Sequence, residues 1–189
     1  LIYSCNAMKG TSMMEVLFDK EELLNLTDMN EALVNSDKFN GLGSCGKLEV
    51  LIEDMIRNAD VNKKNYDIWK NEAVEACEDN SITEDFKIKQ ILKVLENDLN
   101  PKCIETLTNL GILEYCLPKL FTKIDKNTTI FLTRYSKNVG SITGNSLDKF
   151  IVLLAIFPIK AALQTFASLD IKENKDIYIN SLALLEDFS

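Results

Sequence analysis

Histidine is missing from this chain, and its absence removes the side chain that most often serves as a neutral-pH acid, base or metal ligand. A Ser-His or Cys-His nucleophile pair cannot be built without it. Glycine is scarce as well, with seven residues, and Gly41-Leu42-Gly43 lacks the rest of a phosphate-binding fingerprint. These absences predict that the chain is not an enzyme and uses no cofactor or metal.

Long hydrophobic runs are also missing. The best candidate, residues 150–159, is far shorter than the roughly 20 apolar residues that a membrane helix needs, and Pro158 interrupts it. The first ten residues, LIYSCNAMKG, lack a charged region followed by a long apolar one, so they do not indicate secretion. We therefore predict no membrane association.

The five cysteines show no CxxC pair and no spacing typical of a metal site. Cys77, Cys103 and Cys116 fall on apolar faces of expected helices, which predicts small buried side chains that do not react. An odd number of cysteines without a disulfide framework indicates a reducing compartment.

Acidic residues outnumber basic ones, 29 to 21, giving a net charge of −8. This balance argues against strong nucleic-acid binding, which needs clustered Lys and Arg, and favours a protein partner. Half of the net charge precedes residue 46, where three lysines face seven acidic residues. The glycine-containing break at 39–46 therefore predicts an acidic, partly amphipathic N-terminal arm over residues 1–45 and a folded core over 46–189. The alternative is that the arm packs as the first helices of the domain.

Apolar residues recur at helical spacing over most of the chain. Residues 86–121 predict three short helices in a row, with a helix stop at Gly111, which can adopt the left-handed conformation after a helix end. Residues 128–135 are β-branched enough to suggest a strand, but nothing could pair with it, so a short helix or ordered crossover is predicted. Residues 147–157 predict a very apolar, central helix. The chain should be all-α, with about seven or eight helices in a right-handed superhelical stack of the armadillo or HEAT kind.

The order of several motifs resembles one family of transcription elongation factors. These motifs are LIEDMIRNADVNKKN (51–65), KIKQILKVL (87–95), ETLTNLGILEYCLPKLF (105–121), FIVLLAIFPI (150–159) and INSLALLEDF (179–188). Together they are similar to the core of the IWS or SPN family, which interacts with the suppressor-of-Ty-six histone chaperone and is related to the N-terminal domain of transcription factor IIS. The resemblance covers roughly residues 46–189.

This resemblance implies a nuclear, monomeric binding module that acts in transcription elongation and mRNA processing. It would capture an acidic, aromatic-bearing peptide from the N-terminal region of the chaperone and couple the chaperone to RNA polymerase II. Phe166 matches a partner-contacting aromatic of the family, and Ala162 stands where relatives have an arginine. Lys87 and Lys89 match the basic side of a core helix. The alternatives are a core aromatic for Phe166 and a solvated face for the two lysines.

Two further hypotheses come from the residues themselves. Residues 13–26, MMEVLFDKEELLNL, form an acidic segment with one Phe and several leucines, so the arm itself resembles the peptide that the family binds. It could be a self-docking mimic or a partner segment joined to the core. The second hypothesis is a different function, an α-helical bundle that binds host signalling or apoptosis helices.

Overall fold

The computed structural model describes residues 12–25, 30–58, 66–96, 102–122, 135, 138–139, 142–171 and 174–186. All regular elements in these ranges are helices, and the chain is all-α as predicted. The described ranges contain thirteen helices, of which seven have eight residues or more. No helix within these ranges is long and apolar enough to cross a membrane.

The chain divides into two compact units, Leu1–Phe86 and Lys87–Ser189. The predicted boundary at 45/46 therefore falls inside the first unit. Residues 123–134, which include most of the crossover predicted at 128–135, lie outside the described residues, as does Pro101.

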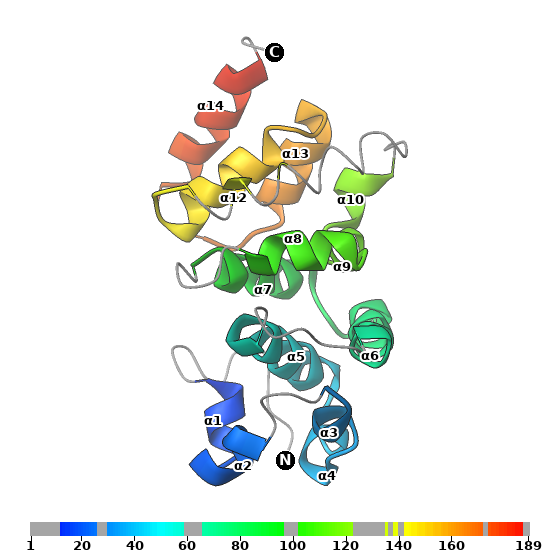
Figure 1. Cartoon of the computed structure of the whole chain (residues 1–189). Helices are drawn as coiled ribbons and strands as arrows, with labels where there is room; N and C mark the ends of the chain where they lie inside the picture. The colour runs from blue at the N-terminus through cyan, green and yellow to red at the C-terminus, as the bar shows by residue number, and fades with distance from the viewer. Residues whose placement is uncertain are drawn as a thin grey trace. The chain divides into compact units, whose positions relative to one another are not determined.

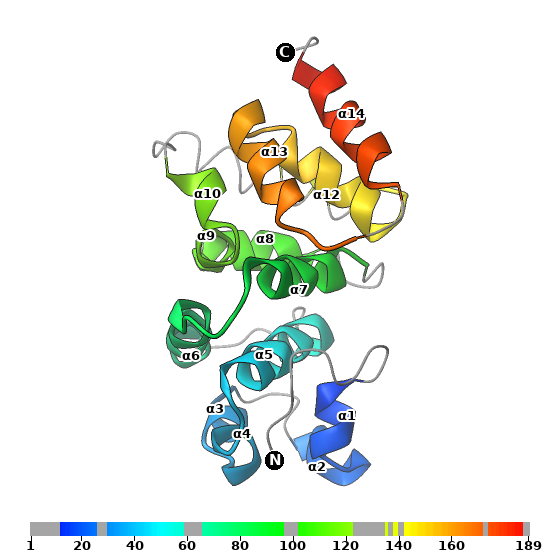
Figure 2. The same cartoon turned by 180° about the vertical axis from the view of Figure 1, so that it is seen from behind.

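The first unit is built around one long helix, α5 (Ser44–Asn58). It lies between α1 and α6 (Figures 1 and 2). The other helices are α1 (Met13–Leu17), α2 (Lys20–Asn25), α3 (Asn30–Val34), α4 (Asp37–Asn40) and α6 (Tyr66–Glu78). Trp69 of α6 is fully buried and its Nε1 donates to the carbonyl oxygen of Leu51 at 3.1 Å. This hydrogen bond satisfies the one polar atom of the largest core side chain.

Residues within the predicted N-terminal arm supply part of the core of the first unit. Met13, Met14, Phe18 and Leu33 are buried, and α1 packs on α5. Burying these side chains removes apolar surface from water, at about 1.5–3 kcal/mol for each large side chain. The described part of the arm is thus packed as the first helices of this unit, which is the alternative that the sequence left open.

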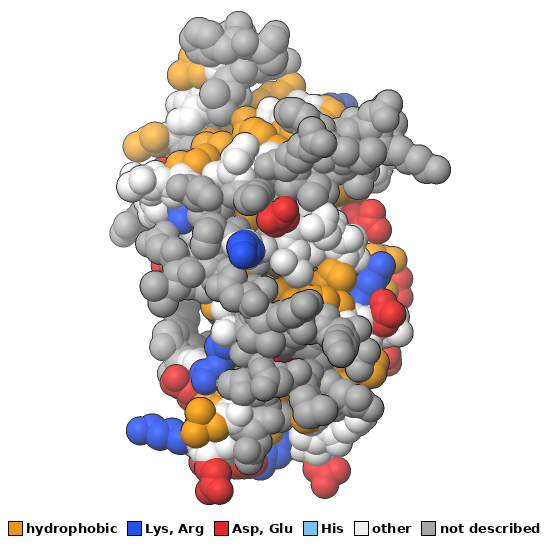
Figure 3. Space-filling view, viewed as in Figure 1, with side chains coloured by type: hydrophobic (Ala, Val, Ile, Leu, Met, Phe, Trp, Pro, Cys, Tyr) orange, Lys and Arg blue, Asp and Glu red, His pale blue; other side chains and the backbone are white. Residues whose placement is uncertain are grey.

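Most of α7 (Glu84–Glu96) belongs to the second unit, which also holds α8 (Lys102–Asn109), α9 (Ile112–Cys116), α10 (Pro118–Phe121), α12 (Ser146–Leu154), α13 (Ile159–Ala167) and α14 (Lys175–Glu186). α13 packs against α10 and α14, and α14 also packs against α12. Hydrophobic side chains show at the surface around α12, α13 and α14 in Figure 3. Gly111 has φ 75° between α8 and α9, which confirms the predicted left-handed helix end.

Helix α12 begins at Ser146, one residue before the predicted range of 147–157, and Asn145 is its cap. The Asn145 side chain accepts from the Asp148 N–H at 2.9 Å, and the Asp148 carboxylate accepts from the Asn145 N–H at 3.3 Å. This reciprocal pair satisfies two backbone donors at the helix start. Similarly, Thr83 caps α7 by accepting from Phe86 N–H at 3.1 Å.

Candidate functional site

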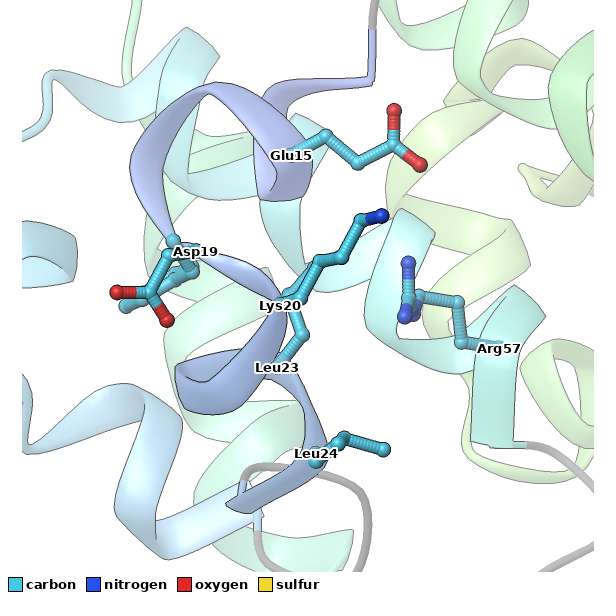
Figure 4. Close-up of a pocket in the computed structure, with 7 residues that line it drawn as sticks. Glu15, Asp19, Lys20, Leu23, Leu24 and Arg57 are labelled. Carbon is cyan, nitrogen blue, oxygen red and sulfur yellow. The ribbon is translucent and has the colours of Figure 1, made fainter.

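A hollow of about 710 Å³ lies in the first unit, beside α1, α2 and the last turn of α5. We call it the α2 hollow. Its lining residues are Glu15, Phe18, Asp19, Lys20, Leu23, Leu24 and Arg57 (Figure 4). Its volume is within the range of about 300–1,000 Å³ that is usual for ligand pockets.

Glu53 of α5 fixes one wall of the hollow by holding the start of α1. Its carboxylate accepts hydrogen bonds from Ser12 Oγ at 2.9 Å, from Met13 N at 2.9 Å and from Met14 N at 2.8 Å. A negative charge is favourable at a helix start because the free N–H groups there carry partial positive charge. Arg57 follows Glu53 by four residues, so both side chains lie on the same side of α5. Arg57 therefore lines the hollow together with residues of α1 and α2.

A reciprocal pair of side chains also starts α2. Asp19 Oδ1 accepts from Glu22 N at 2.8 Å, and Glu22 Oε1 accepts from Asp19 N at 3.2 Å. Lys38 donates to both oxygens of Glu22, at 2.9 and 3.0 Å, and its Nζ lies 5.4 Å from the centre of the Phe18 ring. Glu22 is therefore paired with Lys38, the Asp19 carboxylate accepts a backbone N–H, and the Phe18 ring lies beside the Lys38 ammonium.

The remaining charges of the hollow are two cations and one anion. Figure 4 shows the Lys20 and Arg57 side chains pointing toward one another, Glu15 extending to the same side, and Asp19 pointing away. Both cations are exposed, and no described residue forms an ion pair with either of them. The lining thus holds two cations and two carboxylates, and the two cations lie together on one side while the Asp19 carboxylate is directed away from them.

Leucine side chains supply an apolar wall beside these cations. Leu23 is buried, whereas Leu24 is 72% exposed, the highest exposure of any large hydrophobic residue in the described ranges. An exposed apolar side chain beside two cations that have no ion pair within the described ranges suits a ligand that combines carboxylates with apolar groups. Arg57 in particular can bind a carboxylate through two parallel hydrogen bonds.

The site residues expected from the sequence lie elsewhere, in the second unit. Phe166 and Ala162 lie one turn apart on α13 and are both buried, with Phe166 fully covered. The Phe166 ring lies 6.3 Å from that of Phe150 and 6.0 Å from that of Tyr178. Because Ala162, Thr165 and Phe166 all lie on the inward face of α13, the ring of Phe166 is a core aromatic and presents no surface to a partner in this structure.

Lys87 and Lys89 are half-buried residues of α7, two positions apart. The structure therefore brings Phe166 and Ala162 together on one helix and holds the two lysines on another. Among the described residues, no group of three or more Cys, Asp and Glu side chains is placed to hold a metal ion.

The cysteines divide into two kinds. Cys77, Cys103 and Cys116 are free and buried, as their positions on apolar helix faces predicted. Cys45, in the first turn of α5, is disulfide-bonded. The expectation that the chain has no disulfide is thus wrong for Cys45. Spacing along the chain could not show this bond because disulfide partners meet through folding and need no local pattern.

Arg57 and Lys20 were missed by the sequence reasoning. Arg57 is one of only two arginines in the chain, and it falls within residues 48–59, where apolar residues recur at helical spacing. The sequence therefore could have identified it as a candidate binding residue on a helix. Lys20 is surrounded by acidic residues in the sequence, so the segment was interpreted as acidic and this lysine was overlooked.

Comparison with protein-family models, with curated proteins and with solved structures finds no match to this chain.

Proposed function

We propose that the chain is a non-catalytic protein-interaction module that captures acidic peptides carrying apolar side chains, and that the α2 hollow is its binding site. The observation that carries the proposal is the pair of cations, Lys20 and Arg57, which form no ion pair with any described residue and lie beside the exposed side chain of Leu24. Peptide carboxylates would pair with the cations, and an apolar side chain would cover Leu23 and Leu24. Burial of a few apolar anchors supplies most of the affinity in such complexes.

The resemblance to the IWS or SPN family supports a narrower proposal. The partner is then the acidic, aromatic-bearing N-terminal peptide of the suppressor-of-Ty-six histone chaperone, and the module acts in the nucleus during transcription elongation. The packing of neighbouring helices, α5 with α6 and α8 with α9, is consistent with a right-handed superhelical stack of the armadillo kind. The site moves from the helix carrying Phe166 to the α2 hollow, because Phe166 is buried.

The disulfide at Cys45 weighs against the nuclear part of this proposal. Disulfides are rare in nuclear and cytosolic proteins because thiol-based reductants keep cysteines reduced there. Capture of an acidic peptide does not depend on the compartment, so the two parts of the proposal are tested separately. If a pull-down from nuclear extract fails to recover the histone chaperone, the chaperone is rejected as the partner. Peptide capture is tested independently by a binding assay.

Arg57→Glu tests peptide capture directly. The probe is a labelled peptide in which Asp and Glu alternate with Leu and Phe, and its affinity for the full chain is measured by fluorescence polarisation. We expect Arg57→Glu to weaken binding by about tenfold or more, which corresponds to about 1.4 kcal/mol per tenfold. The change replaces an attractive charge by a repulsive one at the hollow, so the salt dependence of binding should also fall.

Lys160→Glu is the matched control. Lys160 is an exposed residue of α13 that does not line the hollow, and its substitution makes the same change in net charge. This control should change the affinity by less than about twofold. Equal effects of the two substitutions would show that only net charge matters, and the proposed site would then be rejected.

A further inference from the structure

Helix α14 has an inward face and an apolar outward face. Leu182 is fully buried, and Tyr178 contacts Phe166, so this side packs in the second unit. Ile177 and Leu184 are 62% and 59% exposed, and their spacing of seven residues places them on one side of the helix. Between them, Ser181 Oγ donates to the carbonyl oxygen of Ile177 at 2.8 Å, so its hydroxyl is satisfied within the helix. The outward face therefore carries two exposed apolar side chains two turns apart, with the exposed side chain of Asn180 between them.

Two residues of opposite charge, Lys175 and Asp176, lie in the first turn of α14 beside this face. Lys175 Nζ donates to the carbonyl oxygens of Ala167 and Leu169, both at 3.1 Å, and so caps the end of α13. Asp176, next to Ile177, is exposed and has no ion pair with any described residue. The outward face of α14 thus combines exposed apolar side chains with a carboxylate that has no ion pair among the described residues, the combination that the α2 hollow is suited to bind.

We propose that the outward face of α14 in one copy of this chain docks in the α2 hollow of a second copy. Asp176 pairs with Lys20 and Arg57, while Ile177 and Leu184 cover Leu24. The inference rests on the proposed function, since it uses the same hollow. It also replaces the expected monomer by a self-associating chain.

The contact joins two different surfaces, so it is heterologous. Each copy that docks its α14 still offers a free α2 hollow, and each copy whose hollow is filled still offers a free α14. Association of this kind continues beyond a dimer unless it closes into a ring. The average mass of the wild-type chain should consequently rise steadily with concentration.

Complementary variants test this arrangement by sedimentation velocity on the full chain. We expect Leu184→Glu and Arg57→Glu each to be monomeric, because each removes one of the two surfaces. An equimolar mixture of the two variants should form dimers and nothing larger, since the mixture keeps one intact hollow and one intact α14 face. Circular dichroism verifies that both variants keep their helix content, and Lys160→Glu should associate like the wild type.

A wild-type mass that does not change with concentration overturns the self-association, as does a mixture that stays monomeric. If Leu184→Glu instead binds the acidic peptide more tightly while the wild type stays monomeric, α14 docks within its own chain, and the second-copy proposal is rejected. None of these results affects peptide capture. Failure of the peptide to bind Leu184→Glu, whose hollow no α14 can occupy, would overturn the proposed function itself.

Discussion

Single residues fix the local geometry of the first unit through hydrogen bonds between helices. Asp79, which directly follows α6, accepts from Ser44 Oγ at 2.5 Å and from Ser81 N at 2.8 Å. The hydrogen bond from the Ser44 hydroxyl is the main cause that lowers the pKa of Asp79 from its usual 3.8 to about 2, and the Ser81 bonds add to it. Because Ser44 begins α5, this carboxylate joins the start of one helix to the end of another.

The lowered pKa of Asp79 predicts a defined pH dependence of stability. A carboxyl whose pKa is lower in the folded state stabilises the fold at pH values above its unfolded pKa, and this contribution is lost as pH falls through the folded pKa. The wild type should therefore be more stable than Asp79→Asn above about pH 4, and the difference should shrink toward pH 2. Urea denaturation of both proteins across this range measures the difference. A constant difference would show that Asp79 acts only through neutral hydrogen bonding.

At the scale of elements, α13 shows how one helical stripe can support two interpretations. Ala162 and Phe166 lie one turn apart on an apolar face, which is typical both of a core helix and of a helix that contacts a partner. The family resemblance favoured the partner. Packing of α10 and α14 against α13 buries this face, and that packing depends on where distant segments of the chain fold.

Phe166→Ala should consequently destabilise the second unit and not merely affect binding. Phe166 is fully buried and contacts the rings of Phe150 and Tyr178, and removing such a ring leaves a cavity that costs about 3–5 kcal/mol. Chemical denaturation followed by circular dichroism measures the loss. Ile177→Ala, a substitution on the exposed face of α14, serves as the control and should cost about 0.5 kcal/mol or less. A Phe166→Ala protein of wild-type stability that binds peptide poorly would restore the partner role.

Local signals predicted several element boundaries because helix caps depend on residues a few positions apart. Gly111 ends α8 as expected from its sequence context, and Ser12 accepts from Glu15 N at 3.4 Å as the cap of α1. The stronger support for the start of α1 is Glu53, about forty positions along the chain, which no local pattern could show. The same limit applies to Arg57, whose helix was predicted but whose neighbours on α1 and α2 were not.

For the whole molecule, the number of disulfide-bonded cysteines tests whether the chain belongs in a reducing compartment. The sequence indicated such a compartment, whereas the disulfide at Cys45 weighs against it. Five cysteines are present, three described ones are free and buried, and Cys45 is bonded. Thiol titration of the denatured chain, without reductant, should therefore detect three thiols, and reduction should raise the number to five. Buried thiols should react slowly in the native protein because the reagent cannot reach them. Five reactive thiols before reduction would instead support the reducing compartment that the sequence indicated.

The sequence by itself determined the all-α class, because apolar residues at helical spacing and local caps act within a few turns of the chain. It also determined the burial of Cys77, Cys103 and Cys116, which follow those apolar stripes. Only the tertiary structure decided that Phe166 faces the core and that Lys20 and Arg57 meet around one hollow. The physical reason is that long-range packing chooses which helix faces are covered, and residues far apart in sequence become neighbours only through that choice.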